Sequence, residues 1–432
     1  MKTGVINSKK PLKHFKIMQE EKIHIKEFSP RSIFRHVQGD RSIWAIVVIL
    51  TMMSLLVVYS STGTLAYKLS RSPESYLLKQ ILFVVFGAGI IYCAHIIKYS
   101  VYSNIAKILF IISVPLLVYT LFFGTNINDA SRWIKLPIIN LTFQTSDLAK
   151  LALFMYLSRK LSKHKDTIKD FKNGFLQLIW PIALICILIA PENLSTALLT
   201  GATSLVLLFI GRVSLKHIGL VLLVAAIPVL ILIGIAKSYY NEVEGKSEPL
   251  PNFLTKGRVE TWVNRMQSFM YADKAESSYQ VQQAKIAIAK GGWTGLGPGN
   301  SQARNFLPHP YSDFIYAIII EEYGLLGGCT VLFIYLFFLF RCIRIMKKCP
   351  YAFGAFLSLA LSFTLVIQAL TNMAVNVNLL PVTGVTLPLI SMGGSSFFFT
   401  CVSIGIILSV ARNVESIEGE AANHKPNEVV NS

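Results

Sequence analysis

The segment that decides the fold of this chain is 305–317, which reads Asn-Phe-Leu-Pro-His-Pro-Tyr-Ser-Asp-Phe-Ile-Tyr-Ala. It closes a long polar stretch and opens an apolar run that is long enough to enter a membrane. Asp313 lies at that junction, and Glu321 and Glu322 follow about two helical turns deeper. Because ionisable groups at membrane depth are costly and usually functional, the segment predicts a membrane protein with chemistry at one face of the bilayer.

The composition supports a polytopic membrane protein. The chain has 432 residues, of which 53% are hydrophobic and 15% charged, whereas soluble domains carry roughly 25% charged residues. Its net charge of +18 comes from basic residues gathered in short loops between apolar segments, which is typical of membrane topology rather than of nucleic-acid binding. The six cysteines form no Cys-x-x-Cys pair, which argues against a disulfide framework or a zinc site.

The apolar runs predict an all-α fold with ten membrane-spanning helices. A span needs about 20 apolar residues. The candidates are 43–62, 79–97, 105–123, 146–161, 175–191, 194–211, 217–236, 313–340, 352–377 and 385–411. The fourth is the weakest, because Asp147 and Lys150 interrupt it, and the turn between the fifth and sixth is short enough for a tight hairpin.

The distribution of lysine and arginine predicts that both termini are cytoplasmic. The first 42 residues hold ten of these basic residues, and alternate loops further along the chain are basic as well. The predicted organisation is a basic cytoplasmic tail at 1–42, a membrane domain at 43–411 and a second cytoplasmic tail at 412–432. Two outer loops, 124–145 and 237–312, are long enough to be functional. The larger contains a helix-like stretch at 258–266 with the composition of an interfacial helix.

Several residues at the predicted outer face are candidates for chemistry, and each has a structural alternative. Asp313 is a candidate base, but Ser312 or Asp313 would also make an ordinary helix N-cap. Glu321 and Glu322 are more simply explained by an ion pair inside the helix bundle. Lys150 lies inside an apolar run, which favours a functional or ion-paired role, whereas Trp133 alone is better explained as an interfacial anchor.

Two glycine- and proline-containing segments also stand out. Residues 291–300 are glycine-rich but do not follow a strand and lack the Gly-Lys-Ser/Thr of a nucleotide loop, so they predict a close-packed loop near a ligand. Residues 381–396 contain two prolines and several glycines at membrane depth, including Gly393 and Gly394. They predict either a broken helix that lines a cavity or a simple kink.

Taken in order, these segments resemble the SEDS family (shape, elongation, division and sporulation proteins), in particular its cell-division branch. The resemblance covers about 40–412. It rests on six ordered motifs, namely 128–134 (Asn-Asp-Ala-Ser-Arg-Trp-Ile), 144–151 (Gln-Thr-Ser-Asp-Leu-Ala-Lys-Leu), 191–197 (Pro-Glu-Asn-Leu-Ser-Thr-Ala), Tyr279-Gln280 with Gln283 and the glycine loop, 307–315 around Asp313, and 380–391 (Leu-Pro-Val-Thr-Gly-Val-Thr-Leu-Pro-Leu-Ile-Ser).

The resemblance implies a ten-helix peptidoglycan glycosyltransferase of the bacterial inner membrane, with a large extracytoplasmic loop between helices 7 and 8. Such enzymes polymerise lipid II, a disaccharide-peptide carried on undecaprenyl pyrophosphate, together with a class B penicillin-binding protein transpeptidase and, at the division septum, other divisome proteins. The resemblance implies that Asp313 is catalytic, and the chemistry suits a general base. The residues expected to bind substrate are Arg132, Trp133, Lys150, Glu192, Arg258, Arg265, Gln280, Gln283, Ser391, Gly393 and Gly394.

Arg132 and Lys150, with Arg258 or Arg265 in reserve, are expected to stabilise the pyrophosphate leaving group. A divalent cation, Mg²⁺ or Mn²⁺, stays open as a cofactor, because no ligand set is identifiable in the sequence. Three other functions stay open too: a lipid II flippase, an elongation-type polymerase and an inert divisome scaffold.

Overall fold

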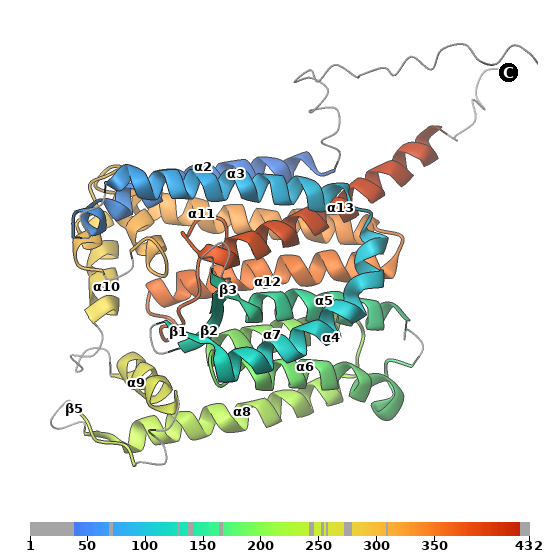
Figure 1. The fold of residues 1–432 in the computed structure, drawn as a ribbon, viewed down its shortest axis with the longest axis horizontal. Coiled ribbons are helices and arrows are strands. Elements are labelled where there is room, and N and C mark those ends of the chain that lie inside the picture. The colour runs from blue at the N-terminus through green and yellow to red at the C-terminus, as the bar shows by residue number, and fades with distance from the viewer. Residues whose placement is uncertain are drawn as a thin grey trace, which may run out of the picture. The chain divides into compact units, whose positions relative to one another are not determined.

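The chain folds as a bundle of long helices with loops at its two ends (Figure 1). The computed structural model describes residues 39–68, 72–127, 130–135, 142–163, 167–241, 246–251, 255, 258–271, 279–307 and 310–423. The predicted tail at 1–42 lies almost wholly outside the described residues. The all-α prediction is confirmed, with two small sheets added at the end of the bundle that carries the longer loops.

The described helices match the ten predicted spans one for one. They are α2 (Arg41–Lys68), α3 (Pro73–Ile96), α4 (Tyr99–Phe123), α5 (Thr145–Lys163), α6 (Leu176–Ile189, preceded by a π-helical turn at Phe171–Phe175), α7 (Leu194–Ile210), α8 (Leu215–Ser238), α11 (Ile315–Lys348), α12 (Ala352–Asn376) and α13 (Gly394–Asn423). By length and hydropathy, eight of the described helices suffice to cross a membrane. Helices α5 and α7 fall short of that test, so the count of ten spans stays a prediction.

The two long loops, 124–145 and 237–312, carry secondary structure of their own. The first holds an antiparallel sheet of β1 (Thr125–Ile127), β2 (Ala130–Lys135) and β3 (Thr142–Gln144), in which Trp133 is paired with Gln144. The second holds a hairpin of β4 (Tyr240–Asn241) and β5 (Lys246–Ser247), then α9 (Val259–Met270), α10 (Tyr279–Gly291) and a 3-10 turn at Ala303–Asn305. The predicted helix at 258–266 is confirmed as α9.

Two predicted helix starts are wrong. The last span was expected from 385, but α13 begins at Gly394, and the preceding residues are irregular because their backbone groups bond to other segments. Residues Ser312 and Asp313 do not cap α11, since its N-cap is Phe314 and no side chain caps it. The tight turn before α7 is confirmed: Asn193 caps that helix by accepting a hydrogen bond from the backbone N–H of Thr196 at 3.2 Å.

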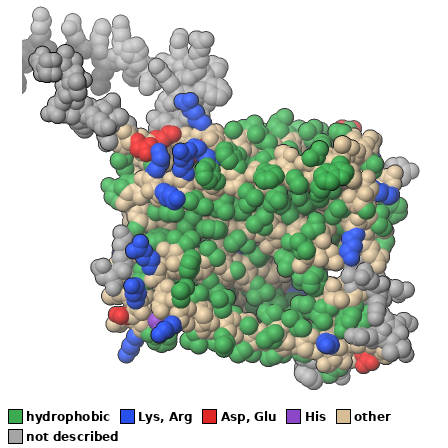
Figure 2. Space-filling model, turned by 180° about the vertical axis from the view of Figure 1, so that it is seen from behind, with side chains coloured by type: hydrophobic (Ala, Val, Ile, Leu, Met, Phe, Trp, Pro, Cys, Tyr) green, Lys and Arg blue, Asp and Glu red, His purple; other side chains and the backbone are tan. Residues whose placement is uncertain are grey.

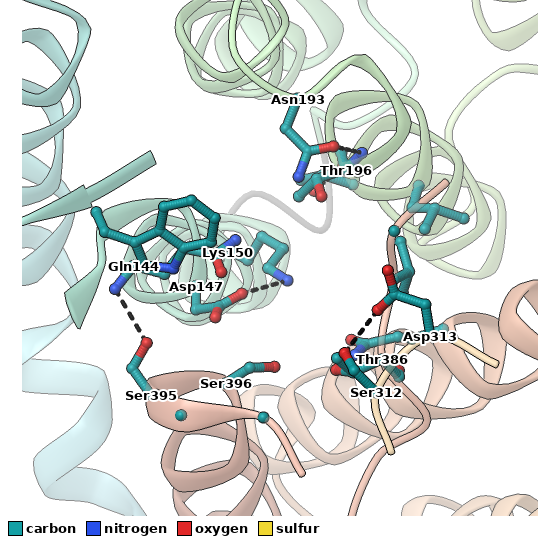
Figure 3. A pocket seen from close by; sticks show the side chains of 18 of the residues that line it. Gln144, Asp147, Lys150, Asn193, Thr196, Ser312, Asp313, Thr386, Ser395 and Ser396 are labelled. Atoms are coloured by element: carbon teal, nitrogen blue, oxygen red, sulfur yellow. Dashed lines mark hydrogen bonds and ion pairs between the residues drawn. The ribbon is translucent and has the colours of Figure 1, made fainter. Parts of the chain in front are cut away.

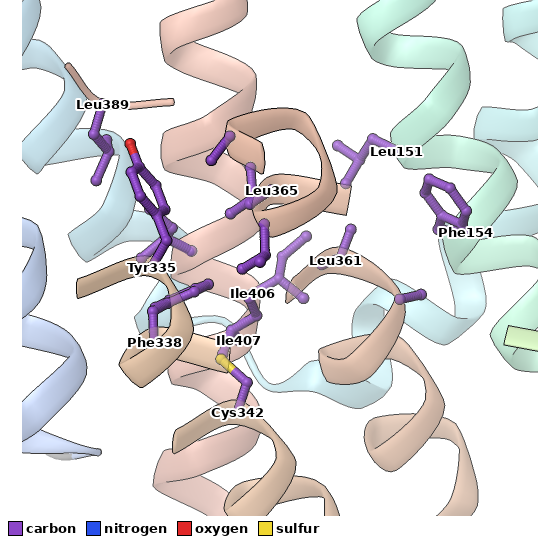
Figure 4. Close-up of a cluster of buried hydrophobic side chains, with 14 of the residues drawn as sticks. Leu151, Phe154, Tyr335, Phe338, Cys342, Leu361, Leu365, Leu389, Ile406 and Ile407 are labelled. Carbon is purple, nitrogen blue, oxygen red and sulfur yellow. The ribbon is translucent and has the colours of Figure 1, made fainter. Parts of the chain in front are cut away.

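The core lies where α5, α11, α12 and α13 meet (Figure 4). Phe154, Tyr335, Leu361 and Ile407 are among its fully or almost fully buried side chains. The surface of the bundle shows a second pattern. Apolar side chains cover the middle of the face drawn in Figure 2, and lysine and arginine gather toward two opposite edges. A belt of apolar side chains between two charged edges is the surface that a bilayer requires.

Helix α11 is broken in its N-terminal part, at Gly324. This residue has φ +70°, and the chain there bonds to the glycine-rich loop instead of to its own helix. The backbone N–H groups of Leu325 and Leu326 donate to the carbonyls of Gly292 and Trp293, at 2.9 and 3.3 Å. Because a Cβ at Gly324 would lie 2.2 Å from the Trp293 carbonyl oxygen, only glycine fits this contact.

Candidate active site

A pocket of about 520 Å³ opens where α5, α7 and α12 meet the turn at 311–313, which ends the large loop (Figure 3). Most of its lining residues are polar. The lining residues are Trp133, Thr142, Gln144, Asp147, Lys150, Asn193, Thr196, Leu199, Thr200, Thr203, Arg258, Arg265, Tyr311, Ser312, Asp313, Thr364, Gln368, Gly384, Val385, Thr386, Gly393, Gly394, Ser395 and Ser396. Six predicted substrate-binding residues and the predicted catalytic residue are therefore brought together here from distant parts of the chain.

Asp313 occupies a tight turn just before α11, on one wall of the pocket. Its carboxylate accepts a hydrogen bond from the Ser312 hydroxyl at 2.7 Å. Its backbone carbonyl accepts two more from α12, from the side-chain amides of Asn372 at 2.9 Å and Asn376 at 3.0 Å. These two buried asparagines fix the peptide of Asp313, so the carboxylate is presented from a rigid backbone.

The irregular segment before α13 forms the floor beneath Asp313. Ser391 donates a hydrogen bond to the carbonyl of Ser312 at 2.7 Å, and the N–H of Met392 donates to the carbonyl of Tyr311 at 3.0 Å. The buried Tyr335 hydroxyl donates to the carbonyl of Pro388. Ser391 itself is buried and does not line the pocket, so the structure gives it a structural contact in place of a substrate contact.

A second carboxylate in the pocket, Asp147, was not singled out from the sequence. Lys150 binds it at 2.8 Å, one helical turn away on α5, and both side chains face the pocket (Figure 3). Asp147 is 5% exposed, and its Oδ2 has no hydrogen-bond partner among the described residues. Two opposite charges spaced i,i+3 in an apolar run already indicate such an ion pair in the sequence.

Two arginines come to the pocket from the large loop. Arg258 precedes α9, and Arg265 lies within it. Arg258 donates to the backbone carbonyl of Glu192 at 3.3 Å, which ties the loop to the turn before α7. Burial and the neighbouring Arg258 lower the pKa of Arg265, whereas Asp313 raises it. With Lys150, the described pocket therefore contains three cations and two carboxylates, a surplus of positive charge.

A row of hydroxyls on α7 was also missed from the sequence. Thr196, Thr200 and Thr203 line the pocket from one face of that helix. Their spacing of four and three residues places them on one stripe, so helical periodicity alone could have found them. They add neutral hydrogen-bonding groups to the α7 wall of the pocket, and Figure 3 shows Thr196 and Asn193 on a different wall from the Asp313 carboxylate.

The remaining predicted residues lie elsewhere. Glu192 and Gln283 do not line this pocket, and Gln280 lines a separate one beside α9. The side chain of Arg132 lies outside the described residues. Among the described residues, no three His, Cys, Asp or Glu side chains come together in a way that could hold a metal ion, so the divalent cation stays a prediction.

Glu321 is held by hydrogen bonds and not by the expected ion pair. It accepts from the Ser301 hydroxyl and from the backbone N–H groups of Gln302 and Ala303. Glu322 accepts from the Ser60 hydroxyl on α2. In the part of the chain that the structure describes, no cation lies within ion-pair distance of either residue. Glu321 therefore docks residues 301–303, just after the glycine-rich loop, onto α11, and Glu322 ties α11 to α2. Neither acid lines the pocket.

Comparison with known proteins gives one consistent family. A family model described as cell cycle protein, covering FtsW, RodA and SpoVE, matches residues 40–416. The probable peptidoglycan glycosyltransferase FtsW of a Geobacter species is 31% identical over 387 residues, covering 87% of this chain and 98% of the relative. The protein of the same name from Nitrosococcus halophilus is 32% identical over 380 residues, covering 86% and 92%.

Solved structures share the fold. The structure described as "Structural coordination of polymerization and crosslinking by a peptidoglycan synthase complex" matches with a TM-score of 0.66 at 20% identity, covering 87% of this chain and 98% of that one. The rod shape determining protein RodA of Thermus thermophilus matches with a TM-score of 0.60 at 20% identity, covering 87% and 97%. These likenesses establish that the helix bundle described above is the one those proteins share.

Proposed function

This chain belongs to the cell cycle protein family of FtsW, RodA and SpoVE, and from that premise we propose that it is a peptidoglycan glycosyltransferase that polymerises lipid II. The observation that carries the proposal is the pocket itself. A carboxylate on a rigid turn, Asp313, shares about 520 Å³ with Lys150, Arg258 and Arg265 at the outer end of a membrane helix bundle. Those groups are what the transfer of a sugar from a lipid pyrophosphate needs.

Asp313 is the proposed general base. In the reaction, the 4-hydroxyl of the acceptor N-acetylglucosamine attacks C1 of the donor N-acetylmuramic acid. The new C1–O bond forms as the bond from C1 to the pyrophosphate oxygen breaks, and the hydroxyl proton passes to the Asp313 carboxylate. Such base assistance is typically worth about 10²–10⁴ in rate. The two asparagines on the Asp313 carbonyl keep that carboxylate in place.

Lys150, Arg258 and Arg265 are the proposed sites for the leaving pyrophosphate, which takes the electron pair of the broken bond. Their charges favour the group most strongly as it becomes more negative in the transition state. Asp147 holds Lys150 at 2.8 Å and so fixes the position of that ammonium in the pocket. Trp133 lines the same wall, where it can pack against the substrate or anchor the sheet at the interface.

The division role rests on the curated relatives, which carry the name FtsW. A lipid II substrate, a class B penicillin-binding protein as partner, other divisome proteins, a septal location and cytoplasmic termini belong to the same proposal. Partnership with a penicillin-binding protein is supported by the structural likeness to a peptidoglycan synthase complex. The alternative of a flippase lacks a comparable supporting observation.

The test is polymerisation of labelled lipid II by the purified protein with its cognate transpeptidase, comparing wild type with Asp313→Asn. Glycan strands from wild type and a loss of about 10²-fold or more in the variant would support a polymerase with Asp313 as its base. Strands of equal yield from both would move the base elsewhere. If neither produces strands, a lipid II translocation assay on the same preparations would test the flippase alternative.

A further inference from the structure

A second, larger pocket of about 760 Å³ lies in the large loop, and none of its lining residues belongs to a helix of the membrane bundle. It is bounded by the residues after β5, by one stripe of α9, by the start of α10 and by the chain just after α12. These elements lie together at the loop end of the bundle (Figure 1). The pocket therefore lies beyond the ends of the spanning helices.

Arg265 lines both pockets, so the two pockets adjoin at this side chain. The neighbouring positions Thr261, Asn264 and Ser268 face the second pocket from the same stripe of α9, at helical spacings of three and four residues. A ligand bound at Asp313 that extends outward past Arg265 would enter the second pocket directly. The two pockets are thus placed as consecutive sites for one extended molecule.

The charges of the two pockets differ in sign. The second pocket contains two carboxylates, Glu248 and Glu260, against the shared Arg265. The active-site pocket contains the three cations Lys150, Arg258 and Arg265 against two carboxylates. A pyrophosphate is therefore favoured in the first pocket and disfavoured in the second. The second pocket therefore suits a part of the substrate that has no phosphate group.

The neutral groups of the second pocket suit sugars. Asn264 and Gln280 offer amide donors and acceptors and make no side-chain hydrogen bond to a described residue, so they are available to a ligand. Phe269 and Tyr279 add aromatic surface of the kind that packs against the C–H faces of sugar rings. The volume falls within the roughly 300–1,000 Å³ of small-molecule sites, which suits a few linked sugars.

We propose that this second pocket binds the sugar backbone of the growing glycan behind the reacting bond, and so keeps the strand attached between additions. The inference rests on the proposed function, since it concerns the product of that reaction. It assigns a binding role to Asn264 and Gln280, and it gives Arg265 a place at the boundary between pyrophosphate and glycan. An enzyme that holds its product in this way makes long strands.

The first test is the length of the strands made from labelled lipid II by the full-length protein with its transpeptidase. Asn264→Trp puts a bulky ring into the pocket, and Gln280→Ala removes one amide. Each should shorten the average strand by about threefold or more, because a lost hydrogen bond weakens binding by roughly 2- to 10-fold. The rate of the first coupling of two lipid II molecules, measured alongside, should fall less than the strand length does, because no grown strand is bound at that step. The matched control is Gln282→Ala, an exposed glutamine of α10 that lines neither pocket.

Strands of unchanged length in both variants would overturn the proposal. Should the wild type make no glycan at all, the proposed function fails first, and a binding test still decides the pocket. The probe is chitotetraose, an uncharged chain of four N-acetylglucosamine units, detected by saturation-transfer NMR on the protein in lipid nanodiscs. Binding that is lost in Asn264→Trp but kept in Asp313→Asn would support a saccharide pocket. Absence of binding, or binding indifferent to Asn264→Trp, would overturn it.

Discussion

Replacing Asn372 with leucine should slow the reaction without weakening substrate binding. Asn372 is 1% exposed and donates two hydrogen bonds from its side chain, to the carbonyl of Asp313 at 2.9 Å and to the carbonyl of Val385 at 2.8 Å. It does not line the pocket. It therefore reaches the pocket through the backbone of Asp313 and of Val385, and leucine preserves its size while removing both bonds.

The magnitude follows from those bonds. A typical hydrogen bond contributes about 1 kcal/mol, and a buried acceptor left unsatisfied costs about 1–3 kcal/mol. The Asp313 carbonyl keeps its bond from Asn376, whereas the Val385 carbonyl loses the one described above. Because polar contacts between membrane helices tend toward the low end, the expected loss of stability is about 2 kcal/mol.

The expected loss in kcat is about tenfold for Asn372→Leu and about 10²-fold when Asn376→Leu is added, since a displacement of about 1 Å of a catalytic group costs about 10²-fold. KM should be unchanged, because neither asparagine lines the pocket. The assay is steady-state polymerisation of labelled lipid II, with thermal unfolding in detergent measured alongside. The control is Ser358→Ala, a fully buried residue of the same helix that donates only to the nearby Ala355 carbonyl.

A variant with the expected loss of stability but unchanged kcat would refute the idea that the asparagines position the base. A fall in kcat for Ser358→Ala of the same size would refute it too, since loosening α12 anywhere would then be sufficient.

Three further predictions follow from particular contacts. Gly324→Ala should destabilise the protein by about 2 kcal/mol or more, because φ is +70° and the new Cβ would lie 2.2 Å from a backbone carbonyl oxygen. The control is Gly89→Ala, which has open space around it and should be neutral or stabilising in the same thermal unfolding measurement. Lys150→Met should cost about 3 kcal/mol because it leaves Asp147 buried without its cation, and adding Asp147→Leu should recover much of that loss in a double-mutant cycle. Burial raises the pKa of Tyr311, so its phenol stays neutral to a higher pH than usual, and Tyr311→Phe should leave the shape of the pH–rate profile unchanged below about pH 10.

The helices could be predicted from the sequence because a run of about 20 apolar residues leaves few alternatives in a membrane. The start of α13 could not. Residues 385–393 are as apolar as a helix, but their backbone groups are satisfied by side chains distant in sequence, such as Asn372 and Tyr335. A hydropathy pattern does not predict such bonds, although the prolines and glycines do indicate that a helix is broken there.

The pocket was predicted in part for a related reason. Asp313 and Lys150 were identifiable because each is an ionisable residue beside apolar ones. Asp147 was treated as an interruption of a span, when its distance from Lys150 along a helix already indicated a pair. Glu321 attracted the same attention as Asp313, but its partners are backbone N–H groups of a loop, which no local pattern in the sequence specifies.

The break in α11 also constrains the order in which the chain can be assembled. At Gly324 the helix cannot satisfy its own backbone, and its missing partners are Gly292, Trp293, Leu296 and Gly297. All four precede α11 in the chain, so they are synthesised before the helix whose backbone they complete. A chain in which the order of loop and helix was exchanged by circular permutation would have to insert α11 with these groups exposed to lipid, at several kcal/mol for each unsatisfied group. The position of the glycine-rich loop ahead of its helix therefore suits insertion during translation.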